Sequence, residues 1–481
     1  MTLQDTNLTT IAYEVMKDRG FIPGFSPAVT NELVSIQKNY SLGNAKYDHR
    51  DKLWISIDNS DSKDLDQLTF AETEDSGTYK LYVAIADVDG LVKKNSQIDE
   101  RAGHNTTSVY TPSIIFPMLP LELSTNLTSL NENEDRQAVV VEILIAADGE
   151  FELHATYMAL VRNHAKLAYD DVADWLEAHK PLLNFSQEVH QLLTLQDQIA
   201  KRIQNYRNRQ GALNFETIEI LPIMKDNNPV GLTAAVHNRA HVLIENCMIA
   251  ANASLSKYLE QQGVPILKRI VREPKRWDRI VELAKTLNTA LPAEPDAKAL
   301  QDFLLKQRAS DPAKFSELSL AMIKLIGKGE YILSAPGQNS PGHFDLALQD
   351  YAHTTAPNRR YPDLIMQRLL KSHLNAQTIP YKAQELSSIA SYCTQKEDDA
   401  TKVERHLKKS AAAIVMIAQI GKKFQGLVTG ASEKGTWVKI KNPPIEGKLV
   451  QGFANLDVGD SVEVELVAVD VAQGHIDFAR A

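Results

Sequence analysis

The spacing of hydrophobic and polar positions changes along the chain, and each change predicts a different element. Two short amphipathic helix patterns come first, near residues 11–16 and 30–37, and they are too small to form a core of their own. From Lys52 the apolar residues alternate, which predicts a strand with one apolar face and a polar face that ends at Asp58. A second strand is predicted over 80–88.

Patterns with a period near 3.6 fill the middle of the chain. They predict helices over 185–209, 238–262 and 386–420, and Gly211 supplies a stop signal after the first of these. On the 238–262 helix, Glu245 shares an apolar face with Met248 and Ile249, so its carboxylate needs a partner or a ligand. After residue 424, short strands separated by turn signals predict a small β-barrel.

Four carboxylates crowd the turn that follows the first predicted strand. They are Asp58, Asp61, Asp64 and Asp66. In a cleft, two such charges ~4 Å apart would repel by roughly 4 kcal/mol at an effective dielectric of about 20, and a divalent cation removes that repulsion. Mg²⁺ combines one or two carboxylates with substrate phosphate, so the cluster indicates metal-assisted phosphoryl chemistry. A solvated acidic turn or a loose Ca²⁺ loop also fits this spacing.

A second candidate site lies at a predicted helix start. Pro362 and Asp363 favour a helix that begins there, which places Arg359 and Arg360 just before its N-terminus. Adjacent arginines are most often surface charge. A helix N-terminus with a guanidinium beside it nevertheless matches a phosphate group in charge and geometry.

Composition limits the class of protein. A chain of 481 residues with 43% hydrophobic residues has material for a core and for two to four domains. Its two cysteines are too few for a disulfide framework, and no signal peptide or membrane span is apparent, so we expect a cytoplasmic protein that does not bind membranes. Because the net charge is −9, a bound nucleic acid would need a local channel.

Several motifs occur in the order in which one protein family has them. The acidic cluster is followed by V-A-I-A-D-V from Val83, T-S-V-Y-T-P from Thr107 and I-F-P-M-L-P-L-E-L-S from Ile115. Together with Y-A-H-T-T-A-P-N-R-R-Y-P-D-L from Tyr351, this order resembles the RNB domain of the ribonuclease II family of processive 3′ exoribonucleases. F-Q-G-L-V-T-G from Phe424 is similar to the start of an S1-type OB barrel.

The resemblance implies an α+β fold. We expect a mixed RNB catalytic domain, with a twisted β-barrel or sheet core and surrounding helices, followed by an all-β OB barrel. The predicted divisions are a helical segment at 1–50, the RNB domain at 51–400, a helical connector at 401–422 and the S1-type domain at 423–481. Family members usually carry one or two cold-shock domains ahead of the RNB domain, whereas about 50 residues precede it here.

The resemblance also implies roles for residues. Asp58, Asp64 and Asp66 would hold Mg²⁺ or Mn²⁺, with Asp61 in support, and Arg359 would stabilise charge on the scissile phosphate. Gln67 stands where most members have a further metal-site aspartate, and its neutral carbonyl should weaken metal binding. The residues expected to contact RNA are Tyr110, Tyr169, Phe215, Glu245, Arg360, Phe424 and Trp437.

The expected function is therefore a monomeric, Mg²⁺-dependent 3′-to-5′ exoribonuclease that hydrolyses single-stranded RNA to nucleoside 5′-monophosphates. A different class of protein stays open: an RNA-binding protein of the same fold in which Gln67 has weakened or abolished hydrolysis. An endonuclease or phosphatase built on the same acidic turn would leave the aromatic and arginine matches unexplained.

Overall fold

The computed structural model of the chain describes residues 7–43, 45–74, 77–178, 185–235, 237–432 and 435–481. Six strands form the central sheet in the order β1-β8-β2-β3-β4-β7, and β7 pairs back onto β8, so that the pairings form a closed circuit. The long strand β8 runs parallel to β2 and antiparallel to β7. The strands of this sheet are β1 (Tyr47–Asp48), β2 (Trp54–Asp58), β3 (Gln67–Thr73), β4 (Tyr79–Ala86), β7 (Asp135–Ile145) and β8 (Phe151–Ala168).

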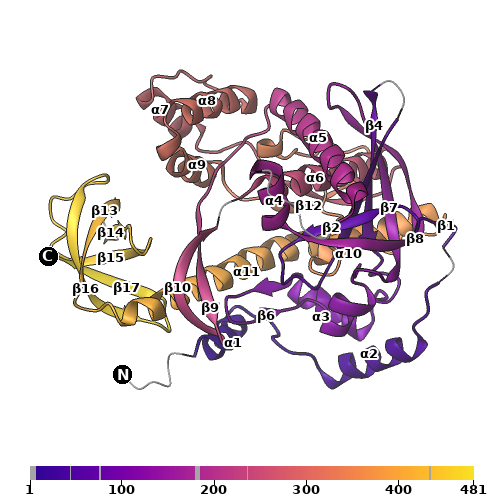
Figure 1. The fold of residues 1–481 in the computed structure, drawn as a ribbon, viewed down its shortest axis with the longest axis horizontal. Coiled ribbons are helices and arrows are strands. Elements are labelled where there is room, and N and C mark those ends of the chain that lie inside the picture. Colours follow the sequence, from indigo (N-terminus) through magenta and orange to yellow (C-terminus); the bar gives the residue numbers. More distant parts are fainter. Residues whose placement is uncertain (1–6, 44, 75–76, 179–184, 236, 433–434) are drawn as a thin grey trace.

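Helices surround this sheet and share its core (Figure 1). Helices α4, α5 and α6 pack against its strands, and α7, α8 and α9 form a separate cluster with a core of their own. The helices are α1 (Leu8–Asp18), α2 (Pro27–Asn39), α3 (Gln97–Asn105), η3 (Leu123–Leu127), α4 (Tyr169–Ala178), α5 (Gln187–Gln210), α6 (Arg239–Gln261), α7 (Trp277–Thr286), α8 (Ala297–Ser310), α9 (Pro312–Ile326), η4 (Phe344–Leu346), α10 (Tyr361–Leu374) and α11 (Ala383–Ile417).

Three two-stranded sheets lie outside the central sheet. They are β5 (Val109–Tyr110) with β6 (Ile115–Phe116), β9 (Glu219–Lys225) with β10 (Asn228–Ala235), and β11 (Ile266–Ile270) with β12 (Glu330–Ser334). The β9–β10 hairpin contacts α11. This contact brings the hairpin close to the C-terminal part of the chain.

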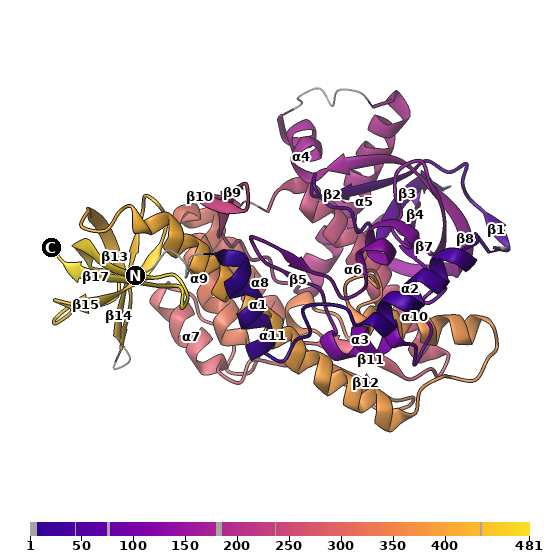
Figure 2. The same cartoon turned by 90° about the horizontal axis from the view of Figure 1, so that it is seen from below.

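The C-terminal residues form a closed barrel at one end of α11 (Figure 2). Its strand order is β13-β14-β15-β17-β16, and apolar side chains of α1, α11 and the barrel share one cluster. The strands are β13 (Lys423–Ser432), β14 (Gly435–Ile440), β15 (Glu446–Gln451), β16 (Ser461–Asp470) and β17 (His475–Arg480). The predicted α+β class with a C-terminal all-β barrel is confirmed.

The structure differs from the sequence expectations in strand β2 and adds detail in helix α11. The polar face predicted for the first strand is wrong, because Trp54 and Ser56 are as buried as the apolar residues Ile55 and Ile57. Strand β2 lies between β8 and β3, and both of its faces are covered. The single helix α11 runs through residues 400 and 401, where the sequence suggested that a connector begins. In the described residues, no helix is long and apolar enough to cross a membrane.

Candidate active site

The acidic turn is an ordered loop between β2 and β3. Ser129 holds its second half, because its Oγ accepts a hydrogen bond from the Leu65 N–H (3.0 Å) and donates one to the Lys63 carbonyl (2.7 Å). Lys166 of β8 donates from Nζ to the Ser62 carbonyl (2.5 Å). The Leu65 side chain is buried. These contacts fix the loop and so fix the carboxylates on either side of Leu65.

Asp66 is a buried carboxylate of this loop, and Asp58, at its start, is partly buried. The Oδ2 atom of each is buried and accepts no hydrogen bond from a described residue. Asp66 Oδ1 accepts from the Asn358 N–H (2.9 Å), and Asp66 Oδ2 lies 3.3 Å from Nε of Arg359. Burial raises the pKa of Asp58 to about 6 and that of Asp66 to about 7, although the charge of Arg359 opposes both shifts. Both carboxylates therefore lack a full set of partners.

Tyr110 joins Asp64 to the rest of the site. Its hydroxyl donates to Asp64 Oδ2 (3.0 Å), and its N–H donates to the Glu404 carboxylate of α11 (2.9 Å). Burial raises the pKa of Tyr110 above its ordinary value, so the phenol stays protonated at neutral pH and acts as a donor. Tyr110 retains 36% exposure and can also contact a ligand.

The two arginines have different surroundings. Both precede α10, as predicted, and Arg360 is its N-cap residue. Arg359 keeps 41% of its side chain exposed, and the Asp66 carboxylate raises its pKa although burial opposes the charge. Arg360 instead donates from Nε and Nη2 to the Asp363 carboxylate (2.8 and 2.7 Å). Arg359 is thus available to a phosphate, while the guanidinium of Arg360 already has a partner; its role in RNA binding stays a prediction.

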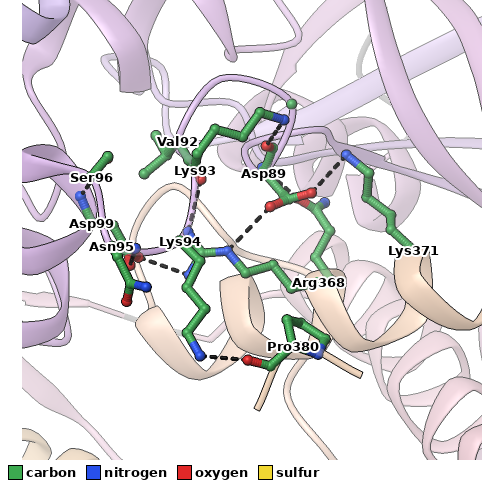
Figure 3. Close-up of polar contacts among 12 residues, drawn as sticks. Asp89, Val92, Lys93, Lys94, Asn95, Ser96, Asp99, Arg368, Lys371 and Pro380 are labelled. Atoms are coloured by element: carbon green, nitrogen blue, oxygen red, sulfur yellow. Dashed lines mark hydrogen bonds and ion pairs between the residues drawn. The ribbon is translucent and has the colours of Figure 1, made fainter. Parts of the chain in front are cut away.

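Buried ion pairs hold α10, and with it the arginine pair, against the segment that follows β4 (Figure 3). Arg368 Nε lies 3.2 Å from an Asp89 oxygen, and its Nη1 lies 2.8 Å from Asp99. Lys371 Nζ also reaches Asp89, at 3.0 Å. Since Arg368 is almost fully buried, loss of both carboxylates would leave its buried charge without an ion pair. These pairs fix where α10 begins.

An aromatic pair stands beside the acidic loop. Tyr169, the first residue of α4, stacks on His241 of α6 with ring centroids 4.0 Å apart and planes 14° apart. Asp58 pairs with Ala168 at the end of β8, so Tyr169, the next residue, lies beside the start of the acidic loop. Burial lowers the pKa of His241, so this ring is neutral at pH 7. Our sequence reasoning missed His241, for which the only signal was its place four residues before Glu245.

Other predicted RNA contacts lie elsewhere. Glu245 is not buried on an apolar face, as the sequence suggested. Its carboxylate is half-exposed and lies 3.7 Å from the ring of His237, whereas Ile249 on the same helix is buried. Phe215 packs partly against the cluster formed by α7, α8 and α9. In the barrel, Phe424 packs edge-on against the buried Phe478, and Trp437 lines a cavity beside α11.

The oxygen donors of this loop suit a hard cation, although they do not form a finished cage. Within the described ranges, no three carboxylate, histidine or cysteine side chains lie close enough to hold a metal ion by themselves. The Oδ2 atoms of Asp58 and Asp66, which accept no hydrogen bond from a described residue, nevertheless supply two hard ligands whose burial disfavours bare negative charge. Gln67 is buried next to Asp66 and adds no charge. Further ligands would have to come from Asp64, water or substrate phosphate.

Comparison with known proteins yields two family matches. Residues 46–376 match the family described as "RNB domain". Residues 422–481 match the "RNase II-type exonuclease C-terminal S1 domain". The first match covers more than half of the chain, and the two together include every residue discussed in the acidic loop, the arginine pair and the barrel.

Individual proteins are similar over nearly the whole chain. Ribonuclease R of Escherichia coli is 28% identical over 524 residues, which include 99% of this chain but 63% of that protein, so the chain spans less than two thirds of this relative. A structure titled "Mycoplasma genitalium RNase R in complex with ribose methylated single-stranded RNA" superposes with a TM-score of 0.89 at 25% identity, covering 99% of this chain and 78% of the other. A structure titled "Structure of yeast Ssd1, a pseudonuclease" shares the fold, with a TM-score of 0.70 and 17% identity over 95% of this chain and 57% of that one.

Proposed function

The chain belongs to the RNB-domain family, and from that premise we propose that it is a 3′-to-5′ exoribonuclease that uses Mg²⁺ or Mn²⁺ to hydrolyse single-stranded RNA to nucleoside 5′-monophosphates. The observation that carries the proposal is a pair of buried carboxylate oxygens, Oδ2 of Asp58 and Oδ2 of Asp66, that accept no hydrogen bond from a described residue, with Nε of Arg359 3.3 Å from the Asp66 oxygen. Carboxylate oxygens can bind a metal ion, and an adjacent guanidinium can bind a phosphate group. The site therefore suits a phosphodiester whose phosphate also contacts the metal ion.

In this proposal Asp58, Asp64 and Asp66 hold the metal ion. When bound, the ion supplies Lewis-acid stabilisation of the phosphate and lowers the pKa of a ligated water. The side chain of Arg359 binds a non-bridging oxygen of the scissile phosphate, where its charge counts most as negative charge develops. The Tyr110 hydroxyl, which donates to Asp64, keeps that carboxylate oriented.

The aromatic pair supports an exonuclease over an endonuclease. The ring of Tyr169 is backed by His241 on one face, so its other face is the one on which a terminal base could stack. Stacking accepts every base, which suits an enzyme that removes one nucleotide after another without sequence preference. The relative whose title names bound single-stranded RNA supports the same class of substrate.

The second candidate function is RNA binding without efficient hydrolysis. It is favoured by one observation, the buried and neutral Gln67 beside Asp66, and a protein titled a pseudonuclease has the same fold. The number of carboxylates in the acidic loop therefore does not decide between hydrolysis and RNA binding, and a test of cleavage is needed.

One assay separates the two functions. Single-stranded RNA labelled at its 5′ end is incubated with the protein over a range of Mg²⁺ and Mn²⁺ concentrations, and the products are resolved by length. We expect a ladder that shortens from the 3′ end and release of nucleoside 5′-monophosphates. Absence of cleavage at every metal concentration, with RNA binding intact, would establish the binding protein instead.

A further inference from the structure

A short backbone bridge holds the arginine pair in place. Thr107 pairs with Arg360 as an isolated antiparallel bridge outside the sheets. Two hydrogen bonds flank this pair: the Ser108 N–H donates to the Arg359 carbonyl (2.9 Å), and the N–H of the first α10 residue donates to the Thr106 carbonyl (2.8 Å). The backbone of this three-residue segment therefore helps to set where Arg359 lies.

Thr106, the first residue of the segment, has a conformation that threonine rarely adopts. It follows α3 with φ 59° and ψ −17°, in the left-handed region, and its N–H donates to the Ala102 carbonyl (2.7 Å). For a β-branched residue this region is disfavoured roughly 5- to 30-fold. Such a conformation persists only where the surrounding structure enforces it, so the contacts around Thr106 must do so.

Asn105 joins this strained corner to the N-terminal segment. Its Oδ1 accepts the Ile22 N–H (3.0 Å), and its Nδ2 donates to the Ile22 carbonyl (3.0 Å). The side-chain amide thus pairs with the Ile22 backbone as a neighbouring strand would. Because Asn105 is fully buried at the last position of α3, these two bonds fix the end of the helix directly before Thr106.

The N-terminal segment is itself held by buried cations. Arg101 of α3 donates to the carbonyls of Ile22 (2.7 Å) and Gly24 (3.2 Å), and Lys396 of α11 donates to the Gly20 carbonyl. Both cations are nearly buried, and neither forms an ion pair with a described carboxylate. These carbonyls therefore solvate charges that water cannot reach, which fixes the segment. In both views α2, which follows it, lies beside α3 (Figures 1 and 2).

The corner at Thr106 also leads to the acidic loop. Tyr110, four residues later, donates from its hydroxyl to Asp64 (3.0 Å). A rotation of the Thr106 backbone would therefore disturb both the bridge to the arginine pair and the contact with the acidic loop. Among the described residues, the hydrogen bonds of the Asn105 side chain go to Ile22, so Asn105 acts on the site through this corner.

We propose that Asn105 is a positioning residue for catalysis: its paired hydrogen bonds to Ile22 keep Thr106 in the left-handed conformation that sets the place of Arg359. The inference rests on the proposed function, in which Arg359 binds the scissile phosphate. It also gives the N-terminal segment, which precedes the RNB match, a share in building the site.

The test compares cleavage, RNA affinity and stability in variants of the full chain. Cleavage of 5′-labelled single-stranded RNA is measured with protein and metal in excess, affinity is measured in EDTA, and stability is the urea midpoint. Asn105→Ala removes both bonds to Ile22, and Thr106→Gly removes the penalty of positive φ. Ile145→Ala is the control for lost stability, because Ile145 is fully buried at the end of the sheet away from the acidic loop.

The expected result is a loss of rate that glycine rescues. Asn105→Ala should slow cleavage about tenfold, within the roughly 5- to 30-fold preference against left-handed threonine. RNA affinity should stay within about threefold, because the contact with Arg359 counts most in the transition state. In a Thr106→Gly background the same substitution should cost about threefold or less, since glycine needs no enforcement. Ile145→Ala should lower the urea midpoint and keep the parent's rate.

A double-mutant cycle with Arg359 identifies the group through which Asn105 acts. If Asn105 places the guanidinium fork, Asn105→Ala should slow an Arg359→Lys protein by less than about threefold, because that fork is already lost. A general loss of structure would multiply the two effects. Should Asn105→Ala fail to fold, Asn105→Asp replaces it: this variant keeps an oxygen for the Ile22 N–H, loses the donated bond and must show the same rescue.

The outcomes that overturn the reasoning are distinguishable. If the parent does not cleave RNA at any metal concentration, the proposed function fails and this inference fails with it. If the parent cleaves and Asn105→Ala keeps its rate, Asn105 does not position the site. If Asn105→Ala is slow but Thr106→Gly gives no rescue, or if its effect multiplies with that of Arg359→Lys, Asn105 only supports the fold and the assigned role is wrong.

Discussion

Replacing Asp66 by asparagine should make the metal-free protein more stable while it abolishes catalysis. Burial raises the pKa of Asp66 from its ordinary 3.8 to about 7. A carboxyl whose pKa is raised by folding favours the folded state below pH 3.8, and this contribution is lost as the pH rises through about 7. The shift is about 3 pH units at ~1.4 kcal/mol each, so the charged carboxylate costs roughly 4 kcal/mol at pH 8.

Asparagine removes that charge but does not recover the whole cost. Its carbonyl can still accept the Asn358 N–H, whereas its NH₂ replaces the oxygen that accepts no hydrogen bond and lies 3.3 Å from Nε of Arg359, so that this NH₂ has no acceptor there. A buried unsatisfied NH₂ costs about 1 to 3 kcal/mol. We therefore expect a net gain of roughly 1 to 3 kcal/mol in the free energy of unfolding at pH 8 in EDTA, which shrinks as the pH falls and becomes a net loss of about 1 to 3 kcal/mol below pH 4, where the parent's carboxyl is protonated.

The assay is urea or thermal unfolding at several pH values in EDTA, repeated with Mg²⁺ or Mn²⁺. Asp61→Asn is the matched control, because Asp61 is an exposed carboxylate of the same loop, and its effect should stay within about 0.5 kcal/mol. Metal should stabilise the parent more than Asp66→Asn, since it binds the folded state that carries the carboxylate. If Asp66→Asn is less stable than the parent at pH 8 without metal, or if it retains cleavage, the assigned role of Asp66 is wrong.

Other substitutions test the remaining parts of the site. Gln67→Asp should lower the metal concentration for half-maximal cleavage in a titration on one labelled RNA, because it adds a carboxylate; an unchanged midpoint would place residue 67 outside the metal site. Arg359→Lys keeps the charge but loses the planar fork, so cleavage should slow much more than RNA binding weakens, and full activity would reduce Arg359 to a simple electrostatic contact. His241→Ala should weaken RNA binding by about 0.5 to 1.5 kcal/mol through its stacking on Tyr169, and the effect should vanish in a Tyr169→Ala background if the two rings act as a unit.

The elements that sequence predicted best have long, uniform patterns. The helix expected over 238–262 is α6, Arg239–Gln261, with Asn238 as its N-cap. A period of 3.6 that continues over many residues, with a capping residue at its start, leaves little room for another interpretation. Strand β2 was predicted less well. Alternation shows which side chains share a face of the strand, but it does not show whether other elements cover that face. Trp54 is buried beside Phe70 and Tyr82, on the face expected to be polar.

The site was predictable only where its members are neighbours in sequence. The spacing of the aspartates marked the acidic loop, and Pro362 with Asp363 marked the start of α10. The contacts that complete the site join residues far apart in the chain, as when the Asn358 N–H meets Asp66. A single sequence carries no physical signal for such pairs. The family resemblance predicted that Arg359 belongs to the site, whereas no motif of that family indicated His241.

The cost of the buried carboxylates bears on the choice between an enzyme and a binding protein. Asp58 and Asp66 each keep an oxygen buried without a hydrogen-bond partner, and burial raises both pKa values toward neutrality. A protein that only bound RNA would gain nothing from this, because buried anions weaken the fold and disfavour a phosphate nearby. A divalent ion shared with the phosphate reverses both effects at once. With Gln67 in place of a further carboxylate, the protein ligands alone hold such an ion weakly, so RNA and metal should each strengthen the binding of the other, which favours hydrolysis that requires both.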